Sequence, residues 1–168
     1  MGALVIRRAT KDDCHHIRRL IQELAVFEGM ESQVEVSEKT LENDGFENAP
    51  PFFHSLLATL DNEVIGYALY YYLYSTNEGG EIFYLEDLYM KEEYRGKGHG
   101  KQLFMAVVEE AQKRRSACMQ WCVLNWNSKA IDFYKSLGAF DLTLSQDIHM
   151  YRLTFSVIGR ILTEKGTT

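Results

Sequence analysis

The 168-residue sequence contains few of the residues that mark a secreted, membrane-spanning or multidomain chain. It has 2 prolines, both at the end of one loop, and 3 cysteines without metal-ligand spacing. An odd number of such cysteines indicates reduced thiols, so we expect a cytoplasmic protein without a resident metal. No apolar run reaches the length of a membrane span, and we expect no signal peptide and no membrane partner. A disulfide-stapled domain is excluded.

The composition favours one compact domain that spans residues 1–168. Hydrophobic residues make up 46% of the chain, and no repeat, low-complexity segment or linker interrupts it. The net charge of −6 is uneven, because residues 1–93 carry 18 acidic and 7 basic side chains whereas residues 94–168 carry 6 and 11. This division fits a cationic partner and a polyanionic partner, or simply an uneven solvated surface. The small basic excess and the pI of about 5.4 disfavour a nucleic-acid partner.

The most informative stretch is a glycine-rich loop between an alternating, β-rich segment and an amphipathic helix. The loop and its basic flank consist of Arg95, Gly96, Lys97, Gly98, His99, Gly100 and Lys101. Such a loop leaves backbone N–H groups unpaired at the positive end of the helix dipole, where an anion is favoured. Because glycine has no Cβ, a phosphate can approach the backbone closely. The stretch predicts a phosphate-binding site, although a basic, solvent-exposed connector would use the same residues.

The spacing of these residues excludes two common phosphate-binding loops. A P-loop needs Gly-x-x-x-x-Gly-Lys followed by Ser or Thr, but Gln102 follows Lys101 and Arg95 replaces the first Gly. A dinucleotide fingerprint needs a third Gly three residues after Gly98, where this chain has Lys101. The pattern that fits is Arg-x-x-Gly-x-Gly. It resembles the acetyl-CoA pyrophosphate loop of the GNAT acyltransferases.

Hydrophobic periodicity and turn signals predict a mixed α+β fold in one domain. We expect strands at residues 4–8, 53–60, 64–74, 82–90 and 119–124, with two late strands at 140–143 and 149–155. Helices are expected after Thr10, after Ser37, after the glycine loop and from Asn127 to Leu137, and residues 44–51 are expected to form a loop.

Further stretches extend the resemblance from about residue 5 to about residue 143. They are similar to the diamine acetyltransferases of the GNAT family, the spermidine/spermine and thialysine enzymes. The stretches include Asp13-Cys14, Glu23-Leu-Ala25, Phe27-Glu28, Tyr84-Leu-Glu-Asp87 and Asn127–Gly138. The resemblance implies the GNAT fold, in which helices flank a central, mostly antiparallel twisted sheet. It also implies acetyl-CoA as co-substrate, direct transfer in a ternary complex and a homodimer.

Acetyl transfer to an amine requires a neutral nitrogen, a polarised thioester carbonyl and a proton for the departing thiolate. Because an alkylammonium has a pKa of about 10, a base must first remove its proton. The resemblance implies that Glu86 is this base, acting through water, and that Tyr134 is the acid. Without the resemblance, the residues themselves favour a packed core aromatic for Tyr134 and a solvated strand carboxylate for Glu86.

The resemblance also implies two sets of binding residues. Acetyl-CoA is expected at Leu88, Tyr89, Met90, Arg95, Gly96, Lys97, Gly98, His99, Gly100, Lys101, Asn127, Ser128, Lys129 and Ala130. The amine is expected at Phe27, Glu28, Glu86, Gln120, Trp121 and Cys122. The backbone of the first three cofactor residues is expected to hold the pantetheine arm.

The predicted function is acetylation of a small cationic amine, either a thialysine-like or lysine-like amine or a polyamine. Two features favour the thialysine type, namely Phe27 and the stretch Tyr74–Thr76. The resemblance implies Tyr at the first place and an acidic residue at the second in the polyamine enzymes. One alternative is a GNAT that acts on protein N-termini or lysines. Another is a non-catalytic acyl-CoA-binding module, which would be expected to lack the acid or the base.

Overall fold

The computed structural model describes residues 2–146 and 150–164 of the chain. The chain divides into two compact units, which we call unit 1 (Met1–Leu124) and unit 2 (Asn125–Thr168). Unit 1 contains the sheet and the glycine loop, whereas unit 2 contains the predicted acid, Tyr134.

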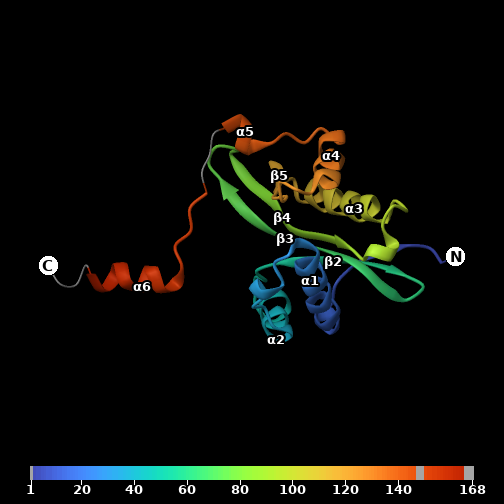
Figure 1. Ribbon diagram of the computed structural model, residues 1–168, viewed down its shortest axis with the longest axis horizontal. Coiled ribbons are helices and arrows are strands. Elements are labelled where there is room, and N and C mark those ends of the chain that lie inside the picture. Colours follow the sequence, from blue (N-terminus) through green and yellow to red (C-terminus); the bar gives the residue numbers. More distant parts are fainter. Residues whose placement is uncertain (1, 147–149, 165–168) are drawn as a thin grey trace. The chain divides into compact units, whose positions relative to one another are not determined.

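A five-stranded sheet forms the centre of unit 1 (Figure 1). Its strands are β1 (Val5–Arg8), β2 (His54–Leu60), β3 (Glu63–Ser75), β4 (Gly80–Met90) and β5 (Cys118–Trp121), in that spatial order. The first three pairings are antiparallel, and only β4 and β5 are parallel. The predicted hairpin is confirmed, with Asp61 and Asn62 at positive φ in its tight turn. The mixed fold class is therefore confirmed.

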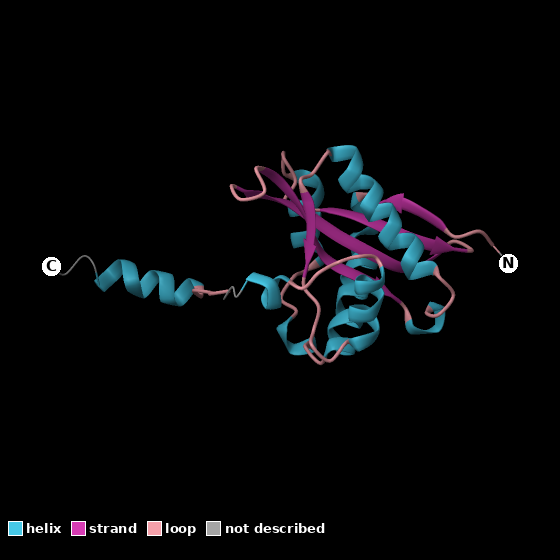
Figure 2. Cartoon of the chain, turned by 90° about the horizontal axis from the view of Figure 1, so that it is seen from above, coloured by secondary structure: helices cyan, strands magenta, loops and turns pink. Residues whose placement is uncertain are grey.

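Helices cover both faces of this sheet (Figures 1 and 2). One face carries α1 (Cys14–Glu28), α2 (Glu38–Glu42), the short 3-10 helices Lys11–Asp13 and Glu31–Gln33 and the π-helix Asn43–Glu47. The opposite face carries α3 (His99–Arg114), which buries Leu103, Phe104 and Val107. A further 3-10 helix, Glu92–Tyr94, leads from β4 to the glycine loop. On the α1 face, Ile17, Leu20 and Tyr67 are fully buried in one apolar cluster.

Local hydrogen bonds fix both ends of the helical segment 11–28, which consists of a 3-10 helix followed by α1. The Asp13 carboxylate accepts from the backbone N–H and the hydroxyl of Thr10 at 2.8 and 2.9 Å and pairs with both Arg7 nitrogens at 2.7 and 2.8 Å. This capping box is the one that the sequence predicts. Gly29 ends the helix at φ 70°, a left-handed conformation that glycine adopts without strain. These caps place Phe27 and Glu28 at the last turn.

A β-bulge in β4 changes the direction of its acidic side chains. Leu69 of β3 pairs with Asp87, but the next residue, Tyr70, pairs with Leu85, so Glu86 is the extra residue. Without the bulge, consecutive side chains would point to opposite faces of the sheet. With it, Asp87 and Glu86 bond to Tyr67 and Tyr71, two tyrosines that point to the α1 face.

Unit 2 contains the helices α4 (Ser128–Ser136), α5 (Leu142–Gln146) and α6 (Phe155–Glu164). The expected strand at 140–143 is wrong, because the Asp141 carboxylate accepts from the Thr143 N–H at 2.9 Å and starts α5. The expected strand at 149–155 is wrong for residues 150–155, and residue 149 lies outside the described residues. There the Thr154 hydroxyl accepts from the Val157 N–H at 3.4 Å at the start of α6.

Two other expectations for the chain's elements need correction. The expected loop at 44–51 begins as the π-helix, which follows α2 directly and continues its helical backbone. Strand β5 ends at Trp121 and not at Leu124, so Cys122 lies just beyond the strand and is exposed.

Candidate active site

The glycine loop has the conformation and the open space that an anion site requires. Gly96 and Gly98 have φ values of 74° and 82°, and Gly98 is the N-cap of α3. A Cβ added to either of them, or to Gly100, would meet no atom within 4 Å. The first turn of α3 contains no acidic residue. The positive end of the helix dipole therefore faces a space that a phosphate can enter.

The basic residues of the loop are held against neighbouring groups. The Arg95 Nε donates to the Met90 carbonyl at 2.8 Å, and its guanidinium lies 4.4 Å from the Phe27 ring centroid. The Lys97 Nζ donates to the Glu93 carbonyl at 3.0 Å. In the described part of the chain, the buried Nδ1 of His99 has no hydrogen-bond partner. An unsatisfied buried nitrogen at the first residue of α3 is consistent with a polar ligand at this helix end.

The end of β4 leaves one edge of the sheet open. The parallel ladder to β5 stops at the pair Leu85–Trp121, whereas β4 continues to Met90. Among the described residues, no strand pairs with Leu88–Met90 on that side. An unpaired edge offers backbone N–H and C=O groups to a partner with amide groups, such as a pantetheine arm.

Two carboxylates and two tyrosines form a hydrogen-bonded group on the α1 face. The Tyr71 hydroxyl donates to Glu86 at 3.1 Å, and the Tyr67 hydroxyl donates to Asp87 at 2.8 Å. Burial, together with the charges of Glu86 and Glu28, raises the pKa of Asp87 to about 6. Burial also raises the pKa of Glu28. We call Glu28, Glu86 and Asp87 the acidic group.

Asp87 was not among the site residues that the sequence predicts. Strand alternation places it on the face opposite Glu86, and only the bulge brings both carboxylates to one face. The available signal was chemical, because a second carboxylate beside Glu86 in a β-rich segment is expensive to bury unless it has a partner.

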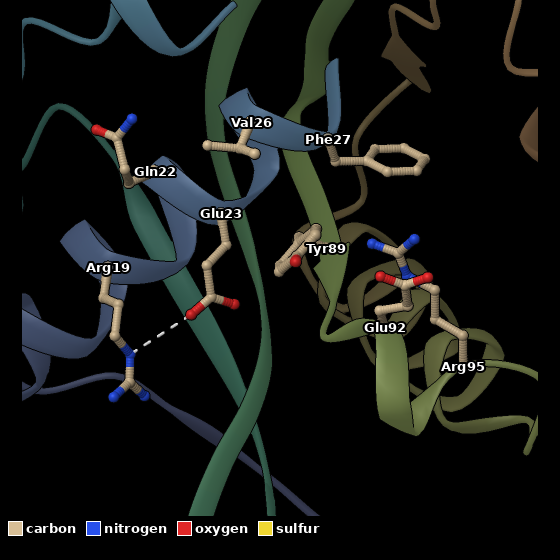
Figure 3. A pocket seen from close by; sticks show the side chains of 8 residues that line it. All are labelled: Arg19, Gln22, Glu23, Val26, Phe27, Tyr89, Glu92 and Arg95. Atoms are coloured by element: carbon tan, nitrogen blue, oxygen red, sulfur yellow. Dashed lines mark ion pairs between the residues drawn. The ribbon is translucent and has the colours of Figure 1, made fainter. Parts of the chain in front are cut away.

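A pocket of about 360 Å³ lies between α1 and the segment that follows β4 (Figure 3). It is lined by Arg19, Gln22, Glu23, Val26, Phe27, Tyr89, Glu92 and Arg95. Phe27 from the last turn of α1 and Arg95 from the loop lie near Tyr89 of β4. This pocket brings together one predicted amine-site residue and two predicted cofactor-site residues.

The residues predicted on and after β5 lie on different sides of the sheet. Gln120 pairs with Tyr84, and the exposed Cys122 Sγ lies 3.2 Å from the Tyr84 hydroxyl. The Tyr84 ring stacks on Tyr71, which in turn bonds to Glu86. Trp121 packs its ring edge-to-face on Phe104 of α3, at 5.7 Å between centroids. Gln120 and Cys122 therefore lie on the side of the acidic group, and Trp121 does not.

Unit 2 contains the remaining predicted residues on and beside α4. The Asn127 side chain accepts from the Ala130 N–H at 3.3 Å, as expected for the N-cap. Ser128 and Lys129 are exposed in the first turn. Burial raises the pKa of Tyr134 to about 12, so its hydroxyl keeps its proton at neutral pH. A proton donor must meet this condition.

The sequence profile of the acetyltransferase (GNAT) family matches residues 12–139. The chain belongs to the GNAT family. It is 44% identical to a thialysine N-epsilon-acetyltransferase of Sus scrofa, over 90% of this chain and 93% of that protein. It is also 34% identical to the human spermidine/spermine N(1)-acetyltransferase-like protein 1, over 90% of this chain but 23% of that protein.

The solved structures agree with this GNAT assignment at the level of the fold. An aminoglycoside N-acetyltransferase in complex with CoA superimposes with a TM-score of 0.71 at 20% identity, covering 91% of this chain and 96% of that one. This chain is an acetyl-CoA-dependent N-acetyltransferase. The loop fits acetyl-CoA, because its glycines leave space for a pyrophosphate at the start of α3. No helix in the described ranges is long and apolar enough to cross a membrane.

Proposed function

We propose that this GNAT enzyme acetylates the primary amine of a small cationic substrate. The acidic group carries the proposal, because three carboxylates near one another on the α1 face form a site for positive charge. The names of the relatives support it, since one is a thialysine N-epsilon-acetyltransferase and another a spermidine/spermine N(1)-acetyltransferase-like protein.

In this proposal the base, the acid and the binding residues have separate tasks. Glu86 takes the proton of the bound ammonium through water, and Glu28 with Asp87 holds the positive charge of the substrate. The loop Arg95–Lys101 and the start of α4 bind the cofactor, and the open edge of β4 orients it. Acetyl-CoA supplies the activated acetyl thioester. Tyr134 holds a proton at its hydroxyl for the sulfur.

Within this class we propose a thialysine or lysine-like amine as the preferred substrate. Phe27 and the segment Tyr74–Thr76 support this choice. The resemblance implies that the spermidine/spermine enzymes have Tyr in place of Phe27 and an acidic residue in the segment. A long polyamine needs several carboxylates along a groove to pair its charges.

We further propose that the two units act together as one GNAT domain, since the family match crosses their boundary. A homodimer and a cytoplasmic location stay predictions.

An amine panel tests the proposal against a GNAT that acts on proteins. Acetyl-CoA turnover is measured with thialysine, lysine, spermidine and short peptides with free N-termini. We expect activity on the small amines and a fall in kcat/KM for Glu28→Gln of about tenfold or more. Glu35→Gln is the matched control, since it removes the same charge from an exposed position. Activity on peptides alone would replace this proposal with the protein substrate.

A further inference from the structure

Tyr67 lies in the part of unit 1 where the apolar core meets the acidic group. Its side chain is fully buried and packs in the same cluster as Ile17, Leu20 and Leu57. Its hydroxyl nevertheless donates a hydrogen bond of 2.8 Å to Asp87. Because the core fixes the ring, it also fixes the position of this donor.

Among the described residues, the charged groups that act on Asp87 are the carboxylates Glu86 and Glu28. Glu86 is the extra residue of the bulge in β4, and Glu28 ends α1; burial and the charges of these two carboxylates raise the pKa of Asp87. The bond from Tyr67 acts in the opposite direction and lowers the pKa of Asp87. It therefore stabilises the ionised carboxylate.

We propose that Tyr67 is a positioning residue of the amine site, whose buried hydroxyl keeps Asp87 ionised and oriented beside Glu86 and Glu28. This inference rests on the proposed function for its effect on the substrate. An ionised Asp87 adds a full negative charge to the site near neutral pH, whereas a protonated one adds none. The hydroxyl thus determines the pH above which the enzyme holds a cation well.

Tyr71 provides a matched control on the same strand. Its hydroxyl donates to Glu86 at 3.1 Å, so Tyr71→Phe also removes one donor from one carboxylate of the acidic group. However, Tyr71 is only partly buried. Tyr67→Phe and Tyr71→Phe each remove a single oxygen and keep the ring, so both variants are expected to fold.

The test follows the Asp87 carboxyl carbon by NMR in protein labelled with ¹³C-aspartate. Its resonance is assigned by its loss in Asp87→Asn. The midpoint of its titration is expected to rise by about 1 to 2 pH units in Tyr67→Phe, the size expected for a lost hydrogen bond to a charged acceptor. In Tyr71→Phe the midpoint should stay close to the wild-type value. An equal midpoint in Tyr67→Phe and wild type would overturn the inference.

A kinetic measurement links this midpoint to the reaction. The acidic limb of kcat/KM for the amine should move to higher pH in Tyr67→Phe by the same amount as the NMR midpoint. In the Asp87→Asn background, Tyr67→Phe should have no further effect on this limb. If wild type acetylates none of the amines, the proposed function fails, while the NMR midpoint still decides the role of Tyr67.

Discussion

The guanidinium of Arg95 lies over the ring of Phe27, with 4.4 Å between its central carbon and the ring centroid. Phe27 belongs to the predicted amine site and Arg95 to the predicted cofactor loop, so one cation–π contact joins the two. The same guanidinium lies 5.3 Å from the Tyr89 ring. The last turn of α1 thus contacts Arg95 at the start of the glycine loop.

Phe27→Leu is therefore expected to weaken acetyl-CoA binding although Phe27 is not a predicted cofactor residue. Loss of an exposed cation–π contact predicts a two- to fivefold increase in the dissociation constant, roughly 0.5–1 kcal/mol. Calorimetry with acetyl-CoA in the absence of amine measures it. Phe52→Leu, at another exposed phenylalanine, is the control. Equal affinities for Phe27→Leu and wild type would mean that the contact does not support the loop.

Gly100→Ala separates cofactor binding from folding at the glycine loop. The added methyl group meets no atom of the protein within 4 Å, and alanine favours a helix more than glycine, so stability should not fall. If the pyrophosphate lies against this turn, the methyl group enters its space, and affinity for acetyl-CoA should fall about tenfold or more. Thermal unfolding measures the stability, and calorimetry on the same sample measures the affinity for acetyl-CoA. A variant that binds as tightly as wild type would contradict the proposed loop site.

Tyr134→Phe tests the proposed proton donor. The substitution removes a hydroxyl whose pKa is about 12 and changes the side-chain volume little. Turnover should fall by about 10²-fold or more, the range for a lost general acid, while affinity for acetyl-CoA stays unchanged. Steady-state kinetics measures the turnover, and calorimetry measures the affinity for acetyl-CoA. Wild-type turnover in this variant would reduce Tyr134 to a packing residue.

Asp87 is expected to make the stability of the protein depend on pH. Its pKa rises from 3.8 to about 6 on folding, so the protonated form favours the folded state and this contribution is lost as pH rises through 6. Asp87→Asn has no titrating carboxyl group at this position and so does not lose this stability. Its free energy of unfolding relative to wild type should therefore increase by about 2 to 3 kcal/mol between pH 4 and pH 8. Denaturant unfolding at both pH values measures it. A constant difference would show that Asp87 is not perturbed.

The parts of the site that local chemistry determines could be predicted from the sequence. The loop conformation follows from glycine's tolerance of positive φ, and Asn127 and Thr10 are recognisable caps. The acidic group could not be predicted completely, because Asp87 joins Glu86 only through a bulge in the β3–β4 register. Strand pairing is a long-range property that alternation within one segment does not contain.

In the C-terminal region the sequence pattern predicts the wrong type of element. Met150, Tyr151 and Leu153 lie in a segment whose apolar pattern also suits a strand, but residues 150–154 form neither strand nor helix and α6 begins at Phe155. Threonine favours a helix start, but the sequence prediction did not use Thr154 in this way.

The side-by-side measurement of kcat/KM for thialysine and spermidine tests the central claim most directly. The account predicts that both amines are acetylated, that thialysine is the better substrate, and that Glu28→Gln weakens both reactions. A clear preference for spermidine would overturn the thialysine assignment. Absence of turnover with either amine would contradict the proposal that the substrate is a small cationic amine.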